Sequence, residues 1–569
     1  MDKVTDNTNE MSFHELFSRR TIVSIPLFQR EYVWGEKQFK RMVQEIDIIL
    51  NKEETNRFLG AVIAVKRNTH PTEPDKYEIV DGQQRLTTLF LFVLAAAAVL
   101  AKNNEDSSAK NLIVNYIINE NFQGINTKLI PSFADRGQFN NAFQQLINSG
   151  DLNNWLGVKA TLPSKSGSDH GKYVNQFKRI KDFLQKRFDE SGSSQLDEII
   201  LIVATKLTFV YILLKDPATA TTVFEGLNDT GVAIGIGDLV RNEVFSKIGD
   251  DSAKAEALHR DSWEPFRDNL GEYFDKYFFP YALIQDSNLT SSELFRGLRK
   301  IWGQVAKPEE IIYKLEEYTG SYLALCMGKY PISYSKSVRL KLDKLVSSSC
   351  PTSLFPFLMQ LLNHYTLGNV NEKDTIDCLE IIESFMIRRA IAGLEPTGLL
   401  SFFKTTWAAC DNKPNGTILK EVILNRSSVE WPDDSRIRNA VRTRNIYSSH
   451  LRQYLLKEYD LSLGSDDPAN EFWIEHIMPQ KLNNEWSMII SNKDHQECVN
   501  TWGNLIPLTQ EMNQSLSQSS FEIKSKEFEN NSVFKSARIL INEFKKWDKE
   551  EILKRSDNIA EWAINRWKR

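Results

Sequence analysis

Four polar residues near the carboxyl end of the chain have types and spacing that could do hydrolytic chemistry. Glu475 and His476 directly follow the short apolar stretch Phe472–Ile474. Asn504 opens a second apolar run, and Asn513 lies where a polar helix is expected to begin. The pattern predicts a strand, a second strand and a helix, which together carry an acid, a histidine and two asparagines.

These residue types match the needs of phosphodiester hydrolysis. A base must activate water, and a cation must neutralise charge on the phosphate and the leaving oxygen. His476 is the expected base because imidazole is largely neutral at cell pH. Glu475 and Asn513 supply hard oxygens, so they are the expected ligands of Mg²⁺ or Mn²⁺. Asn504 is expected to orient the His476 ring, which completes a pattern typical of one-metal HNH (ββα-metal) nuclease sites.

Each of these residues also has a plainer interpretation. The pair Glu475-His476 could merely end a strand, and the asparagines could be turn residues. Other histidines compete weakly for the role of base. His495 follows no apolar strand, and His450 lies inside a basic block.

A second candidate site lies near the amino end, where a strand is expected to run into a helix. The sequence Asp81-Gly82-Gln83-Gln84-Arg85 follows the expected strand Tyr77–Val80 and opens the apolar stretch Leu86–Leu100. A glycine turn at a helix start presents N–H groups and the positive end of the helix to an anion. Arg85 could contact a phosphate and Asp81 could hold magnesium. A tight turn with a structural arginine–aspartate pair is an equally good interpretation.

Both regions resemble the GmrSD-type (type IV, modification-dependent) restriction endonucleases. The carboxy-terminal resemblance is carried by Ile474–Gln480, Gly503–Leu508, Asn513 and Phe521–Lys524. The amino-terminal resemblance is carried by Ile25–Trp34, Asp81–Arg85, Lys128–Asp135, Val223–Gly231 and Asp238–Asn242. This family joins a ParB-like domain with the DGQQR sequence to an HNH nuclease domain.

The resemblance implies roles for further residues. The amino-terminal domain would bind and hydrolyse a nucleoside triphosphate without a Walker-type loop, which the sequence lacks. The residues facing the nucleotide or its metal would be Asp81, Gln83, Gln84, Arg85, Gln29 and Arg30. Tyr32 and Trp34 would form a wall against a base or modified DNA, or simply pack in the core. Lys524 would meet a substrate phosphate, or be a solvated helix lysine.

A basic block precedes the carboxy-terminal motif. The stretch 436–457 contains no acid and holds the cations Arg436, Arg438, Arg442, Arg444, Arg452 and Lys457. Such a block could track a DNA backbone, with Arg438 and Arg442 on one helix face. A solvated charged helix is the alternative.

Composition limits the remaining choices. With 569 residues, 41% of them hydrophobic, the chain can bury a large core and should hold two or three domains. The net charge of −5 excludes a basic character of the whole chain, so DNA binding would be local. Scattered cysteines fit a reducing cytoplasm. We expect no membrane partner, because the first residues lack a signal core and Leu86–Leu100 is shorter than a membrane span.

The expected fold class is α+β and predominantly helical. We expect a ParB-like α/β sensor and NTPase domain over 1–245, a helical linking domain over 246–430 and an HNH nuclease domain over 431–569. The expected function is an Mg-dependent phage-defence endonuclease that nicks or cuts modified double-stranded DNA under nucleotide control. A nuclease toxin acting on unmodified DNA or RNA and a non-catalytic, nucleotide-gated DNA-binding switch are the alternatives. The sequence leaves open the nucleotide, assembly into a homo-oligomer and the mark, for which a glucosylated base and a phosphorothioate are both compatible.

Overall fold

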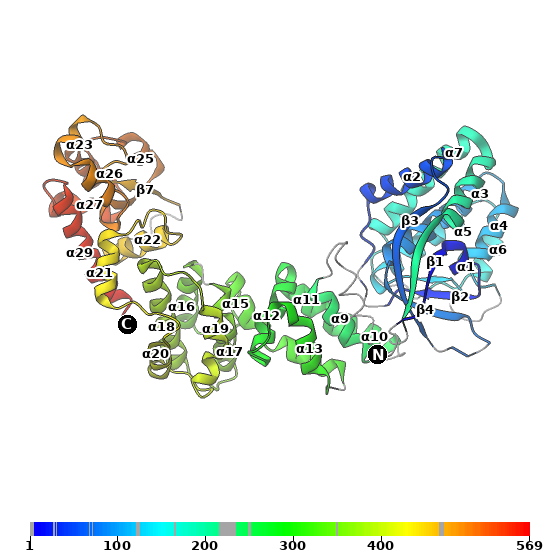
Figure 1. Ribbon diagram of the computed structural model, residues 1–569, viewed down its shortest axis with the longest axis horizontal. Coiled ribbons are helices and arrows are strands. Elements are labelled where there is room, and N and C mark those ends of the chain that lie inside the picture. Colours follow the sequence, from blue (N-terminus) through cyan, green and yellow to red (C-terminus); the bar gives the residue numbers. More distant parts are fainter. Residues whose placement is uncertain are drawn as a thin grey trace. The chain divides into compact units, whose positions relative to one another are not determined.

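The computed structural model forms two compact units, each built mainly of helices (Figure 1). It describes residues 5–26, 29, 31–67, 69–70, 72–120, 126–163, 167–214, 235–248, 252–305, 307–348, 351–465 and 471–569. The first unit comprises Met1–Gly271 with Leu298–Ile312, and the second comprises Glu272–Gly297 with Tyr313–Arg569. The prediction of an α+β, predominantly helical protein is confirmed. The expected domain boundaries at residues 245 and 430 stay a prediction.

A six-stranded mixed sheet organises the first unit, with strand order β1-β6-β3-β4-β2-β5. The strands are β1 (Thr5–Ser12), β2 (Thr21–Ser24), β3 (Arg57–Arg67), β4 (Asp75–Asp81), β5 (Leu129–Ile130) and β6 (Leu207–Leu214). In the centre, β3 runs parallel to β6 and antiparallel to β4. The polar strand β1 lies at the edge and pairs antiparallel with β6.

Helix α3 (Gln83–Lys102) is the core of this unit and packs against α7 (Lys172–Leu201). Further helices in the described part of this unit are α1 (Phe13–Phe17), α2 (Glu36–Leu50), α4 (Asp106–Leu112), α5 (Arg136–Ile147), α6 (Asn153–Lys159), α9 (Ile236–Ser246), α10 (Ser252–Leu258) and α11 (Glu264–Leu270). Among the described helices, α3 alone is long and apolar enough to cross a membrane, but 94% of its apolar window is buried inside the protein. It therefore has the environment of a core helix, as its sequence predicts.

The second unit combines helical hairpins with a small two-stranded sheet. Its sheet pairs β7 (Trp473–His476) with β8 (Leu505–Leu508). The helices from residue 274 onward are α12 (Phe274–Gln285), α13 (Leu294–Trp302), α14 (Pro308–Glu316), α15 (Thr319–Met327), α16 (Lys336–Ser347), α17 (Phe355–Thr366), α18 (Glu372–Ala392), α19 (Leu399–Ala409), α20 (Gly416–Leu424), α21 (Asp434–Thr443), α22 (Arg452–Ser462), α23 (Asn484–Ile489), α24 (Asn492–Cys498), α25 (Gln510–Leu516), α26 (Phe521–Asn531), α27 (Lys535–Arg538), α28 (Leu540–Glu543) and α29 (Lys549–Arg566). Helices α13 and α14 are each shared between the two units.

Two buried arginines on α18 join this helix to the segments that surround the small sheet. Arg388 donates to the carbonyl oxygens of Pro432 and Trp567, and it pairs with Asp434 at 2.8 Å. Arg389 donates to the carbonyl oxygens of Glu430 and Glu395. Backbone oxygens at the ends of helices and loops need such donors when they are buried. The two arginines therefore hold α18 to the segments around the small sheet.

Candidate active site

The end of β7 is held in place by the turn that leads into β8. Glu475 and His476 are the last two residues of β7, which pairs antiparallel with β8. This turn lies directly on α29, because a Cβ atom at Gly503 would come 2.5 Å from the carbonyl oxygen of Ile552. The buried guanidinium of Arg555, on the same helix, donates to the carbonyl oxygens of Trp502, Gly503 and Leu505. Close packing against α29 and these hydrogen bonds thus hold the backbone at the site.

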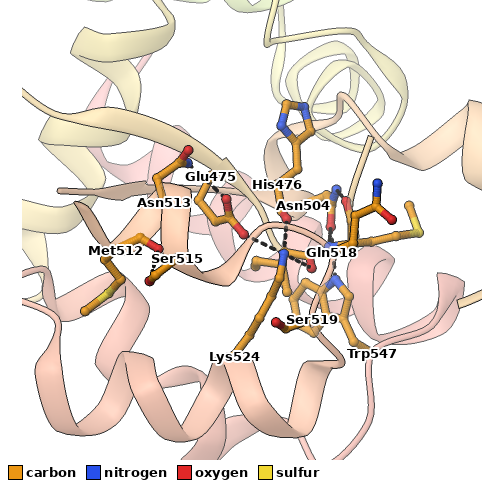
Figure 2. A network of polar contacts seen from close by, with 12 residues as sticks. Glu475, His476, Asn504, Met512, Asn513, Ser515, Gln518, Ser519, Lys524 and Trp547 are labelled. Carbon is orange, nitrogen blue, oxygen red and sulfur yellow. Dashed lines mark hydrogen bonds and ion pairs between the residues drawn. The ribbon is translucent and has the colours of Figure 1, made fainter. Parts of the chain in front are cut away.

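Glu475 forms a buried cluster with residues of two helices (Figure 2). The ammonium of Lys524, on α26, lies 2.5 Å from Glu475 Oε1 and also donates to the carbonyl oxygens of His476 and Ile477, at 3.0 and 3.2 Å. The amide of Asn513, on α25, donates to Glu475 Oε2 at 3.0 Å. The predicted ligand pair Glu475 and Asn513 is therefore brought together, with a lysine on the other side of the carboxylate.

Burial acts on both charges of this cluster. It raises the pKa of Glu475 and lowers the pKa of Lys524, while their mutual attraction opposes both shifts. The Lys524 side chain is 0% exposed. The prediction that Lys524 meets a substrate phosphate is wrong for this arrangement, because each N–H of its ammonium already has an acceptor inside the protein.

The His476 ring lies in a second cluster beside the first. Its Nε2 atom is 3.0 Å from Asn500 Oδ1 and 3.4 Å from the amide nitrogen of Gln480, and the Tyr447 ring packs edge-on at 4.6 Å between centroids. Figure 2 shows the ring directed away from the Glu475–Lys524 pair. Burial lowers the pKa of His476 to about 4, so the ring is neutral at neutral pH. If the ring hydrogen lies on Nε2 and is donated to Asn500 Oδ1, Nδ1 is the proton acceptor.

Asn504 does not orient the imidazole, which corrects the prediction from the sequence. Its Oδ1 accepts from the backbone N–H of Met478 and from the indole N–H of Trp547, at 2.8 and 3.0 Å. Its Nδ2 donates to the carbonyl oxygens of Met478 and Val499. This amide is fully buried and all its hydrogen-bonding capacity is used. The residue that faces the ring is Asn500, which spacing alone could not distinguish from Asn504.

Glu475 and Asn513 would hold a hydrated magnesium ion only with the Asn513 amide turned over, because its Nδ2 now donates to Glu475 Oε2. Mg²⁺ keeps several waters and commonly uses one or two protein oxygens. Glu475 Oε2 already faces the Asn513 side chain, and turning that amide over would bring Oδ1 beside it. Glu475 Oε1 is held by Lys524. Within the described residues, no group of three or more His, Cys, Asp or Glu side chains could hold a metal.

The basic block supplies ion pairs within the second unit. Arg438 and Arg442 share a face of α21, as predicted, and they pair with Glu561 and Asp557 of α29. Arg444 instead donates to backbone oxygens at the end of α18. DNA contact by Arg438 and Arg442 would have to compete with the acids of α29 and stays a prediction.

In the first unit, the two predicted nucleotide-binding segments lie together. Gln84 Oε1 accepts from the N–H of Val33 at 3.0 Å, and its Nε2 donates to the carbonyl oxygen of Glu31. Gln29 donates to the carbonyl oxygens of Ile79 and Val80, at the end of the strand that leads to Asp81. Gln83 is buried at the start of α3. Arg30 and the stretch Val223–Gly231 lie outside the described residues.

Contacts within the first unit also involve Arg85 and the two aromatic residues predicted to line a wall, Tyr32 and Trp34. Arg85 donates to the carbonyl oxygen of Ala61 at 2.6 Å. Tyr32 is 2% exposed, and its hydroxyl bonds Thr88 at 2.8 Å. Tyr32 is therefore a core residue and not a wall against DNA. Trp34 is half-buried against the same core.

Two family models match the chain, and together they enclose both candidate sites. The model of the GmrSD restriction endonuclease, N-terminal domain, matches residues 13–245. The model of the GmrSD restriction endonucleases, C-terminal domain, matches residues 431–562. A search of curated proteins finds no match. The chain therefore belongs to the GmrSD restriction endonuclease family.

Proposed function

We propose that this protein acts in phage defence by nicking or cutting double-stranded DNA that carries a chemical mark. Family membership supports nuclease activity and DNA as the substrate. The observation that carries the proposal is the end of β7, where a neutral imidazole and a carboxylate from adjacent residues each have an asparagine partner. The two groups belong to the last two residues of β7, and the imidazole is directed away from the carboxylate.

In this proposal, His476 accepts the proton of the attacking water at Nδ1. Asn500 holds Nε2, so the ring keeps one tautomer and one orientation. Asn504 and Arg555 keep the supporting turn rigid. Glu475 Oε2 and Asn513 would hold Mg²⁺ or Mn²⁺, which supplies charge neutralisation at the scissile phosphate when bound.

The first unit would bind and hydrolyse a nucleoside triphosphate and so regulate the nuclease. Gly82, in the left-handed region with φ 92°, opens the amino end of α3 at the close of β4. Hydrogen bonds of the Gln29 and Gln84 side chains to backbone groups hold the segment that contains Val33 beside this turn. A helix start of this kind attracts phosphate. We place the protein in the cytoplasm, where it would meet incoming DNA.

Replacing the proposed base tests catalysis directly. His476→Ala should lower the cleavage rate by roughly 10²- to 10⁴-fold, since it removes proton transfer. DNA binding, measured by gel shift, should persist. The control is His450→Ala, at an exposed histidine outside the site. Unchanged cleavage by the His476 variant would remove this site from consideration.

Two asparagine variants separate ring orientation from folding. Asn500→Leu should slow cleavage by roughly 10- to 100-fold and leave the melting temperature near that of the parent, because it removes one contact to the imidazole. Asn504→Ala should instead lower the melting temperature clearly, because four buried hydrogen bonds are lost. The assignment fails if Asn500→Leu cleaves at the parental rate.

Arg85 is the test residue for nucleotide turnover. Arg85→Lys keeps a cation and a donor for Ala61 but loses bidentate phosphate binding, so hydrolysis of nucleoside triphosphates should fall strongly while stability is kept. Arg85→Ala should abolish turnover. The matched control is Lys66→Ala, in an exposed ion pair with Asp75 on the same sheet. Parental turnover in both Arg85 variants would move the nucleotide site elsewhere.

Substrate choice and metal dependence are measured in one assay. The full chain with Mg²⁺ is incubated, with and without nucleoside triphosphates, against matched plain, base-glucosylated and phosphorothioated DNA. We expect cleavage of a modified DNA only, its loss after EDTA treatment, and recovery with Mg²⁺ or Mn²⁺. Equal cleavage of plain DNA would favour a nuclease that ignores modification.

A further inference from the structure

Lys524 is a buried lysine whose ammonium makes three hydrogen bonds, which is unusual for a lysine on a helix surface. It is one of the few side chains of α26 that are buried, and its side chain is 0% exposed. The three N–H groups of its ammonium meet three acceptors: Glu475 Oε1 and the carbonyl oxygens of His476 and Ile477. One cation thus touches the proposed metal ligand and the backbone of the proposed base.

A purely structural role explains this arrangement poorly. Burying two opposite charges costs desolvation that the attraction barely offsets, and an apolar pair of similar volume is often as stable. The backbone turn beside β7 is already braced by Asn504 and Arg555. The charged pair gives the two oxygens of the Glu475 carboxylate different partners. Oε1 accepts from the Lys524 ammonium, and Oε2 accepts from the Asn513 amide.

We propose that Lys524 is a positioning residue that sets the metal selectivity of the site by occupying Glu475 Oε1. The inference rests on the proposed metal-dependent nuclease. With Oε1 held by Lys524, Glu475 can offer only Oε2 to a cation, once the Asn513 amide that now donates to Oε2 has turned its oxygen toward the site. That suits Mg²⁺ and Mn²⁺, which fit small octahedral sites, whereas Ca²⁺ prefers more oxygens and accepts a carboxylate through both. The lysine thereby disfavours Ca²⁺.

The test measures metal affinity of the full chain by calorimetry with Mn²⁺ alone and Ca²⁺ alone, without DNA. Lys524→Met should free Oε1 and shift the affinity ratio toward Ca²⁺ by roughly tenfold. The matched control is Lys526→Met, which removes an exposed lysine of the same helix and should leave the ratio unchanged. Lys524→Gln, which keeps a donor, should give a smaller shift in the same direction and serves if the methionine variant does not fold.

The outcomes separate three roles of Lys524. An equal fall in both metal affinities would mean a structural brace only and would overturn the inference. Unchanged metal affinities, with weaker DNA binding of the Lys524 variants in a parallel gel shift, would mean a phosphate contact and would overturn it as well. Glu475→Gln isolates the proposed function: if the parent binds Mn²⁺ and this variant binds it equally well, the metal site itself is wrong. Loss of Mn²⁺ in Glu475→Gln with an unshifted ratio in both Lys524 variants would refute only the selectivity.

Discussion

The hydrogen bonds of one buried carboxamide tie together the parts of the carboxy-terminal site. Asn504 joins the segment after β7, through Met478, to the end of the preceding helical region, through Val499, and to the indole of Trp547. A carboxamide is suited to this position because it offers two donors and two acceptors without a charge. The strand end that carries the acid and the histidine depends on this junction, since the strands themselves are only four residues long.

The sequence allowed the elements to be predicted but not the partners of individual side chains. Apolar runs indicated β4 and the buried α3, because hydrophobic residues in such runs favour burial. The edge strand β1 was not predicted, since TDNTNEMS has none of the apolar alternation of a half-buried strand and owes its structure to pairing with β6. The pattern of apolar residues indicates local structure, whereas the pairing of an edge strand depends on residues that are distant in the sequence.

In the candidate site, too, the sequence predicted which residues come together better than it predicted their individual contacts. Glu475 and Asn513 lie together as expected, because the strand–helix order places them so. The roles of Asn500 and Asn504 were not separable by spacing, since both precede β8 in one short stretch. Lys524 was expected to be solvated or to meet phosphate, because nothing in an amphipathic pattern signals that a lysine will pair with a buried acid.

The arginine anchor on α18 bears on how the chain can be divided. Arg388 and Arg389 supply hydrogen bonds to backbone oxygens on both sides of the carboxy-terminal family match, which starts at residue 431. A fragment that began at residue 431 and ran to residue 569 would leave Pro432 and Trp567 without these donors. It would also expose the apolar surface that α18 covers, including Ile437 and Val441. A fragment of the carboxy-terminal region should therefore begin before α18, so that this helix still covers the apolar surface and supplies its two arginines.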